Sequence, residues 1–460
     1  MKLLFTQLPS WRALASVLAF LCSSGLICLN QAKTPAAHEP KSAVIPARTF
    51  LITEFGGKGN GITDDTEPIQ KAIAACAKAG GGRVMILSGV YLIRPIELAS
   101  HVALVLEKGA ILKASIKFAD FGLPDPLPAK QSDINQYAKK LQPLISGKSL
   151  EDIAILGEGV IDGSGGPWWA QSDVTVRRNA LVTTTTPDET PAEADMPHYV
   201  PRPHLVAFRD CARVHVQGVT LQNSPMFHLV PARCHDVIIE DVHILAPSDS
   251  PNTDGIDPAN CRDVLIRRCV IDNGDDNIAL KAGSGGMLPT ENITVTDCTF
   301  LHGHGVSIGS EVETGVRHFR VQHCTFEGTD NGLRIKSDRT RGGTVEDVVY
   351  RDITMKNVQL PITVFLYYDD KKQAAHPEFK PMTKETPMIR NIEFHDIRID
   401  GATNKAGEIV GLPESPVADV TLDHVRVTHA AAPWTFQDVR NLQCSGLDVM
   451  TTEPASLGHR

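Results

Sequence analysis

The segment VHVQGVTL, residues 214–221, carries the pattern that decides the fold. Apolar residues alternate with other residues, a polar break of two residues follows, and a second alternating pair completes the segment. The pattern occurs nine times, at steps of about 22 to 29 residues with one step of about 44. The other copies are VIIEDVHI from 237, VLIRRCVI from 264, ITVTDCTF from 293, FRVQHCTF from 319, VVYRDITM from 348, IEFHDIRI from 392, VTLDHVRV from 420 and the weaker LQCSGLDV from 442.

Each copy predicts two short β-strands, because its apolar residues recur with period two and many of them are β-branched. A unit this small cannot bury its apolar face alone, so consecutive units are expected to stack into a continuous core. The predicted fold class is therefore all-β: a single-stranded right-handed parallel β-helix, or solenoid, with a short N-terminal capping helix. A β-propeller is the alternative, but its repeats are longer and carry four strands each.

Length and composition fit one large folded domain. The chain has 460 residues, of which 42% are hydrophobic and 22% are charged, so a sizeable core is expected and intrinsic disorder is excluded. The formal net charge of −9 argues against a nucleic-acid partner, which would require a basic face. A polyanionic ligand would need a local basic site.

The N-terminus has the layout of a secretory signal, with an uncharged stretch at 13–29 that follows Lys2 and Arg12. A transmembrane anchor is the alternative, because the apolar run approaches the length that spans a bilayer. We expect a signal peptide at 1–32, a flexible linker at 33–46 and the β-helix domain at 47–455. The mature protein is then secreted or periplasmic, without stable membrane association.

A glycine-rich segment, 55–66, precedes a helical run from Glu67 to Ala79 that ends in three glycines. Glycine-rich turns can bind phosphates, but this one lacks the Gly-Lys-Ser/Thr of a P-loop. We interpret the helix as a cap over the open end of the first coil.

Eight cysteines remain after the two in the signal are removed, and an even number in an exported protein suggests disulfides. None has the CxxC spacing of a zinc site. In the repeat register they instead form two ladders of residues that act as small hydrophobes, which favours buried free thiols. The spacing of adjacent coils would also permit disulfides. The ladders are Cys269, Cys298 and Cys324, and Cys211, Cys234 and Cys261.

Two stretches interrupt the regular coils, residues 113–147 and 170–202. Both contain several prolines, and the second includes four consecutive threonines from Thr183. We interpret them as surface insertions rather than as separate domains. Loops of this length on a rigid scaffold usually shape a site.

Polar residues gather on four consecutive coils: NTDGID at 252–257, GDDNI at 274–278, GHGVSI at 303–308 and NGLRIK at 331–336. These segments are aligned on Ile256, Ile278, Ile308 and Ile335. Asp254 and Asp276 then become neighbours on successive coils, with Asp275 beside Asp276. Three carboxylates this close repel one another, which raises the pKa of at least one. Because strict alternation would turn Asp254 and Asp276 inward, a turn or bulge is expected at the strand mouth.

Such a cluster suits glycoside hydrolysis, which needs a protonated carboxylic acid on the leaving oxygen and an ionised carboxylate that activates water. A solvated acidic face and a Ca²⁺ site are the alternatives. Arg334 and Lys336 share one face of their strand, and a basic pair beside an acidic centre suits a substrate that carries carboxylates. His304 lies one coil from the acids, where its imidazole is placed to control the protonation state of the catalytic acid.

At these residues the chain resembles glycoside hydrolase family 28, the polygalacturonases and their relatives. Four ordered motifs carry the resemblance, which extends from about Phe50 to about Tyr368. They are Asn-Thr-Asp at 252–254, Gly-Asp-Asp at 274–276, Gly-His-Gly at 303–305 and Arg-Ile-Lys at 334–336.

The resemblance implies that the domain at 47–455 is catalytic and hydrolyses α-1,4-linked galacturonic acid with inversion. Its acid and base carboxyls are then expected about 6.5 to 9.5 Å apart. No metal and no other cofactor is implied. The implied roles are Asp275 as general acid, Asp254 and Asp276 as the groups that activate water, His304 as support for the acid, Arg334 and Lys336 as ligands of a galacturonate carboxylate, and Asn252 and Tyr368, which is adjacent to Tyr367, as further substrate-binding residues.

The expected partner is a polysaccharide, polygalacturonate or pectin, and the protein is expected to be a monomer. The insertions and the lysines at 371, 372, 380 and 384 point to exo action from a chain end. A rhamnogalacturonan or xylogalacturonan hydrolase of the same family is the first alternative. A Ca²⁺-dependent lyase on a similar β-helix and a non-catalytic β-helix such as an adhesin are the others.

Overall fold

The computed structural model describes residues 39–170 and 200–452, except positions 126, 129, 284 and 286. The expected signal peptide, the first part of the linker and most of the second insertion lie outside these residues. Within the described ranges, no helix has the length and apolar character needed to cross a membrane.

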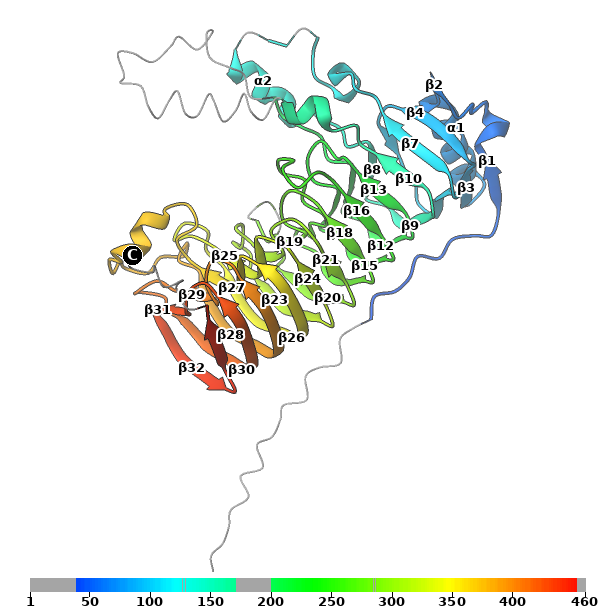
Figure 1. The fold of residues 1–460 in the computed structure, drawn as a ribbon. Helices are drawn as coiled ribbons and strands as arrows, with labels where there is room; N and C mark the ends of the chain where they lie inside the picture. Colours follow the sequence, from blue (N-terminus) through cyan, green and yellow to red (C-terminus); the bar gives the residue numbers. More distant parts are fainter. Residues whose placement is uncertain are drawn as a thin grey trace, which may run out of the picture. The chain divides into compact units, whose positions relative to one another are not determined.

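Each coil contributes strands to parallel ladders, and strands of neighbouring coils lie side by side (Figure 1). The predicted repeat is the observed register: Val214 pairs with Val237, Val237 pairs with Val264, and the pairing continues through all nine copies to Leu442. The first ladder consists of β1 (Thr49–Leu51), β3 (Gly82–Ile86), β6 (Val102–Leu106), β9 (Glu151–Gly157), β12 (Ala212–Gln217), β15 (His235–Glu240), β17 (Arg262–Arg267), β20 (Thr290–Thr296), β23 (Val316–Gln322), β26 (Thr344–Val358), β28 (Met388–Ala402), β30 (Val417–Ala430) and β32 (Val439–Ser445).

A second ladder follows the polar break of each repeat, and β26, β28 and β30 are long enough to belong to both ladders. Its separate strands are β2 (Asn60–Asp64), β4 (Gly89–Ile93), β7 (Ala110–Ala114), β10 (Val160–Asp162), β13 (Thr220–Gln222), β16 (His243–Leu245), β18 (Val270–Asp272), β21 (Thr299–Phe300), β24 (Thr325–Glu327) and β33 (Asp448–Thr451).

The third ladder carries the polar segments singled out above. Its strands are β5 (Ile96–Glu97), β8 (Ile145–Lys148), β11 (Val206–Arg209), β14 (Leu229–Ala232), β19 (Ile278–Leu280), β22 (Val306–Ile308), β25 (Asn331–Lys336), β27 (Leu360–Phe365), β29 (Glu408–Val410) and β31 (Thr435–Gln437). A bridge at Ile256 joins β14 to β19. All three ladders are parallel, as the predicted right-handed β-helix requires.

The polar break of the repeat is the bend between the first two ladders. Its second residue has a positive φ in successive coils, for example 55° at Asp241, 57° at Asp297 and 53° at Asp352. Aspartate tolerates this left-handed conformation better than most side chains. The break therefore bends the chain at the same point of each coil, and the flanking apolar residues turn into one continuous core.

The cysteine ladders lie in this core as predicted. Seven of the eight cysteines in the described ranges are buried, and all eight are free thiols. The amide of Cys211 donates to Sγ of Cys234 at 3.4 Å, and the amide of Cys234 donates to Sγ of Cys261 at the same distance. The thiols thus act as small core residues that also accept backbone hydrogen bonds from the coil before.

The capping helix is α1 (Thr66–Lys78), which follows the short η1 (Ile52–Phe55) and buries Ile69 and Ile73. The glycine-rich segment before α1 uses its amides internally. Those of Lys58 and Gly59 donate to the buried carboxylate of Asp65 at 2.7 and 3.0 Å. These two amides are therefore not free to bind a phosphate, and the apolar face of α1 joins the core at the first coil, as expected of a cap.

The first insertion contains η2 (Phe118–Phe121) and α2 (Gln131–Ala138), and another short helix, η4 (Lys371–Ala375), follows β27. The buried Trp168 packs against Phe118 and Phe121, with ring centroids 4.1 and 5.5 Å apart. This aromatic contact fixes the insertion to its coil.

Candidate active site

The three aspartates lie in bends directly before the strands of the third ladder. Asp254 precedes the bridge at Ile256, and Asp275 and Asp276 precede β19. The expected turn at the strand mouth is therefore present. It allows the carboxylates to leave the inward direction that strict alternation would impose.

One part of the predicted register is wrong. Ile256 pairs with Ile278 as expected, but Ile278 pairs with Val306 rather than with Ile308. The shift is two residues, which a pattern of period two cannot detect because both positions are apolar and face the core. As a consequence, His304 lies opposite Asp276 instead of Gly274, and so comes closer to the acids than the sequence indicated.

Buried asparagines hold these bends. Asn273 donates to the carbonyl oxygens of Thr253 and Asp276 at 2.7 and 3.0 Å. Asn277 donates to Oδ1 of Asn273 and accepts from the amide of Gly305, both at 2.8 Å. The two side chains therefore connect three successive coils behind the acids.

The neighbouring coils come so close to the two glycines beside His304 that no side chain fits there. A Cβ at Gly303, whose φ is +111°, would lie 2.5 Å from the carbonyl oxygen of Asp275. A Cβ at Gly305, at φ +71°, would lie 2.2 Å from that of Gly332. Larger residues at either position would displace the turn that presents the imidazole.

Asp276 is the most tightly held of the three acids. Its side chain is 1% exposed; Oδ2 accepts from Lys336 Nζ at 2.7 Å and Oδ1 accepts from Ser307 Oγ at 2.7 Å. Arg334 Nη1 lies 3.4 Å from Oδ1. The cationic pair thus reaches back to this acid and offsets its charge.

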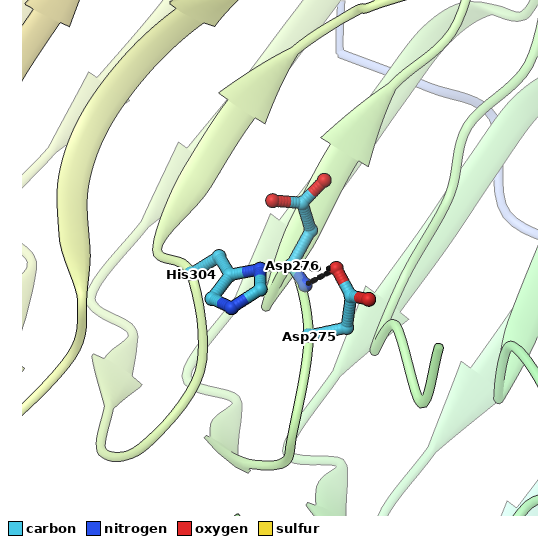
Figure 2. Close-up of side chains that lie close together, drawn as sticks. All are labelled: Asp275, Asp276 and His304. Carbon is cyan, nitrogen blue, oxygen red and sulfur yellow. Dashed lines mark hydrogen bonds and ion pairs between the residues drawn. The ribbon is translucent and has the colours of Figure 1, made fainter. Parts of the chain in front are cut away.

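Asp275 and His304 form the accessible pair, and Figure 2 shows them together with Asp276 at neighbouring turns. Oδ1 of Asp275 accepts from the amide of Asp276 at 2.8 Å and lies 3.1 Å from Nδ1 of His304. Burial raises the pKa of Asp275, but the hydrogen bond from His304 and the charges of His304 and Lys336 outweigh it, so this pKa lies below its usual value.

His304 is held between two carboxylates. Its Nε2 lies 3.4 Å from Oδ2 of Asp330. The hydrogen bond to Asp275 raises the pKa of His304 above its usual value against the opposing effect of burial, with the charges of Asp275 and Asp276 adding to the rise. The imidazole is therefore predisposed to carry a proton beside the proposed acid.

Asp254, unlike Asp275, lies in surroundings that disfavour its charged form. Its side chain is buried, and its Oδ1 has no hydrogen-bond partner among the described residues. Burial raises the pKa of Asp254 well above its usual value, and the charges of Asp257, Asp275 and Asp276 raise it further. The charges of the neighbouring acids thus act on Asp254 in the predicted direction, in addition to the larger effect of burial.

Asp257 is a buried acid that the sequence reading did not assign. Lys281 Nζ lies 3.7 Å from its Oδ2, and burial raises its pKa to about 7 although the charge of Lys281 lowers it. The signal was available, because Asp257 ends the NTDGID segment. Asp330 was also within reach of the sequence argument, because the predicted pairing of Ile308 with Ile335 sets its neighbour Asn331 opposite His304.

The donor atoms of Asp275, Asp276 and His304 lie within 4.8 Å of one another, close enough in principle to hold a metal ion. Ca²⁺ fits poorly, because it binds oxygen ligands and one of these donors is an imidazole nitrogen. Lys336 also occupies one oxygen of Asp276.

A pocket of about 290 Å³ adjoins the acids and contains the cationic pair. Lys336 Nζ and the Arg334 guanidinium lie 5.3 and 5.8 Å from the ring centre of Tyr368. Tyr367 is buried instead, so Tyr368 is the tyrosine that faces this pocket. The eight residues proposed from the sequence thus come together: Asn252, Asp254, Asp275, Asp276, His304, Arg334, Lys336 and Tyr368.

Comparison with known proteins gives consistent results. The family model described as glycosyl hydrolases family 28 matches residues 191–446. A probable polygalacturonase of Vitis vinifera is 29% identical over 89% of this chain and 83% of its own length. An endo-polygalacturonase of Pectobacterium carotovorum subsp. carotovorum is 31% identical over 81% of this chain and 86% of its own. The crystal structure of a hyperthermoactive exopolygalacturonase from Thermotoga maritima superposes with a TM-score of 0.70 at 28% identity, covering 89% of this chain and 94% of that one.

Proposed function

The chain belongs to glycosyl hydrolases family 28, and from its site we propose how it cleaves its substrate. It is a pectin-degrading glycoside hydrolase with a polysaccharide substrate. The bond that we propose is the α-1,4-galacturonosyl linkage. The observation that carries this choice is the cationic pocket of Arg334, Lys336 and Tyr368 directly beside the acids, since a galacturonate unit presents one carboxylate to such a pair.

Asp275 is the general acid in this proposal. Of the three acids it is the one that is not buried, so it is the one that can reach a glycosidic oxygen. In the free protein its pKa is low and that of His304 is high, so the proton of the pair lies on the imidazole. A bound sugar excludes water from Asp275, which favours the neutral carboxyl and draws the proton across the 3.1 Å contact.

Asp254 and Asp276 activate the water. The raised pKa of Asp254 makes its ionised form a good base toward this water. Both oxygens of the buried Asp276 are engaged by Ser307 and Lys336, which makes it a poor nucleophile toward an anomeric carbon. Direct attack by water, and hence inversion, is therefore favoured although Asp275 and Asp276 lie close together.

Exo action, export and the domain limits belong to the same proposal. Lys371 lines the pocket beside Tyr368, and a cation at this place restricts how far a long chain extends past the pocket. The segment at 1–32 would direct export to the periplasm or the medium, and the catalytic domain would span 47–455. The exopolygalacturonase of Thermotoga maritima supports exo action, whereas the Pectobacterium relative is an endo-enzyme.

The test is reducing-end release from polygalacturonic acid in the presence of a chelator, for wild type, Asp275→Asn and the control Asp297→Asn in a polar break. Wild type and control are expected to release reducing ends, and Asp275→Asn is expected to lose at least 100-fold in kcat. Monomer or dimer from the first minutes supports exo action, and a ladder of oligomers supports endo action. NMR of the first product determines whether the anomeric carbon is inverted.

Other outcomes favour the alternatives. Products with an unsaturated ring, detected by ultraviolet absorbance and lost with the chelator, would indicate a lyase. Release only from rhamnogalacturonan or xylogalacturonan would change the substrate but keep the mechanism. Binding without new reducing ends on any of these polymers would indicate an adhesin.

A further inference from the structure

The carboxyl group of Asp275 is held from two sides. His304 faces its Oδ1, as described above, and on the other side Asn252 Nδ2 donates to Oδ2 at 3.3 Å. Asn252 is exposed and has a φ of +52°. An exposed amide can present either its oxygen or its nitrogen to a neighbour, so a further contact must determine which of them faces Asp275.

That contact comes from Arg202. Its side chain is only 6% exposed, and Nη2 donates to Oδ1 of Asn252 at 2.6 Å. Nη1 donates to the carbonyl oxygens of Pro251 and Pro225 at 2.6 and 2.9 Å, which fixes the plane of the guanidinium. Arg202 therefore contacts both the backbone before Asn252 and the side chain of Asn252.

The chemistry of arginine determines the direction of the amide. A guanidinium has only donors, so it must face the oxygen of Asn252 and not the nitrogen. The NH₂ group is then directed toward Asp275, where it donates to the carboxylate. A reversed amide would place its oxygen against an ionised carboxylate and its nitrogen against a cationic donor, which is unfavourable at both ends.

We propose that Arg202 is a positioning residue for the general acid, acting through Asn252. It fixes the side-chain amide of Asn252 so that the amide orients the Asp275 carboxyl toward the scissile bond. This inference rests on the proposed function of Asp275. Arg202 itself is buried and does not meet the sugar, so it affects kcat rather than substrate affinity.

The first experiment compares kcat and KM on polygalacturonic acid for wild type and Arg202→Met. Loss of orientation at an acid is expected to lower kcat about 10- to 100-fold and to leave KM within about twofold. The alkaline limb of the pH profile of kcat should move to higher pH, because the amide donor favours the ionised form of Asp275 and its loss makes the proton harder to remove. Arg202→Lys, which keeps one donor for Asn252, should recover most of the loss.

The second experiment separates positioning from general stabilisation by repeating Arg202→Met in an Asn252→Ala background. If Arg202 acts through Asn252, the additional loss of kcat in that background is less than about twofold. An equal loss of kcat in both backgrounds, or an unchanged kcat in the wild-type background, would overturn the proposal. Should Arg202→Met fail to give a folded protein by circular dichroism, Arg202→Gln in the same two backgrounds replaces it, with the same two criteria.

The outcome for Arg202 is distinguishable from failure of the proposed function. A wild-type protein that releases no reducing ends from galacturonan refutes the function before any variant is compared. A wild-type protein that is active, with Arg202→Met fully active as well, refutes only the positioning role.

Discussion

Replacing Lys336 with methionine is expected to destabilise the protein as well as to weaken substrate binding. Lys336 and Asp276 form an ion pair of 2.7 Å whose side chains are 8% and 1% exposed. Removing one partner of a buried pair leaves an uncompensated charge and costs about 3 to 5 kcal/mol. Arg334 and Ser307 still contact Asp276, so a loss near 3 kcal/mol is expected.

Most of this loss of stability is expected to disappear when Asp276 is replaced too. In Lys336→Met/Asp276→Asn no unpaired carboxylate is left, and well-packed neutral replacements of buried pairs are often close to neutral for stability. The double variant is therefore expected to unfold within about 1 kcal/mol of wild type. It should nevertheless be inactive, because the proposed base and one substrate ligand are both absent.

The assay is urea unfolding followed by circular dichroism and by tryptophan fluorescence, with ΔG compared only where the two probes agree. Lys356→Met is the matched control, because its pair with Glu327 spans 3.4 Å between side chains that are 58% and 55% exposed. Such surface pairs contribute at most about 1 kcal/mol. Equal losses in Lys336→Met and Lys356→Met, or no recovery in the double variant, would refute the reasoning.

Three further predictions follow from the site. The pH profile of kcat/KM should be bell-shaped, with its acidic limb above pH 3.8, because the base Asp254 has a raised pKa and must be ionised. Its alkaline limb should report loss of the proton from His304, whose pKa is also raised. His304→Gln should therefore move the alkaline limb to lower pH. Gly305→Ala should cost more than 2 kcal/mol or so in urea unfolding, because its Cβ would lie 2.2 Å from a backbone oxygen, whereas Gly328→Ala, at a similar φ of +77° with open space around it, should cost only about 1 kcal/mol. Tyr368→Ala should raise KM at least tenfold with a smaller change in kcat, and a reversed pattern in steady-state kinetics would contradict its place in the carboxylate pocket.

The fold was predictable because the repeat consists of apolar side chains at fixed positions. Every copy from Val214 to Leu442 pairs in the register that the alignment gave, since a shift by one residue would turn each apolar set to solvent. The third ladder was less predictable. Around Ile278 a shift by two residues keeps the apolar pattern, so that pattern cannot distinguish pairing with Val306 from pairing with Ile308.

The residues of the site could be predicted from the sequence, but the ion pairs and hydrogen bonds between them could not. The motifs named the acids and the cations, yet the pairing of Asp276 with Lys336 depends on side chains that cross two coils. The contact of Asp330 with His304 lies between coils that pair as predicted, Ile308 with Ile335, but it depends on where the two side chains point, which an apolar pattern does not give. Arg202 lies about 50 residues before Asn252 and meets it only because the coils stack.

The balance of charges connects substrate binding to catalysis. A polyanion would be repelled by clustered carboxylates, but here Asp276 is paired with Lys336, Asp275 faces His304, and Asp257 faces Lys281. In the proposed mechanism, a galacturonate carboxylate that enters the pocket competes with Asp276 for the ammonium group of Lys336. Asp276 would then accept a proton from water only when a charged substrate is in place. By this argument a methyl-esterified unit, which cannot compete for Lys336, leaves the base engaged, so esterification should slow the chemical step in addition to weakening binding.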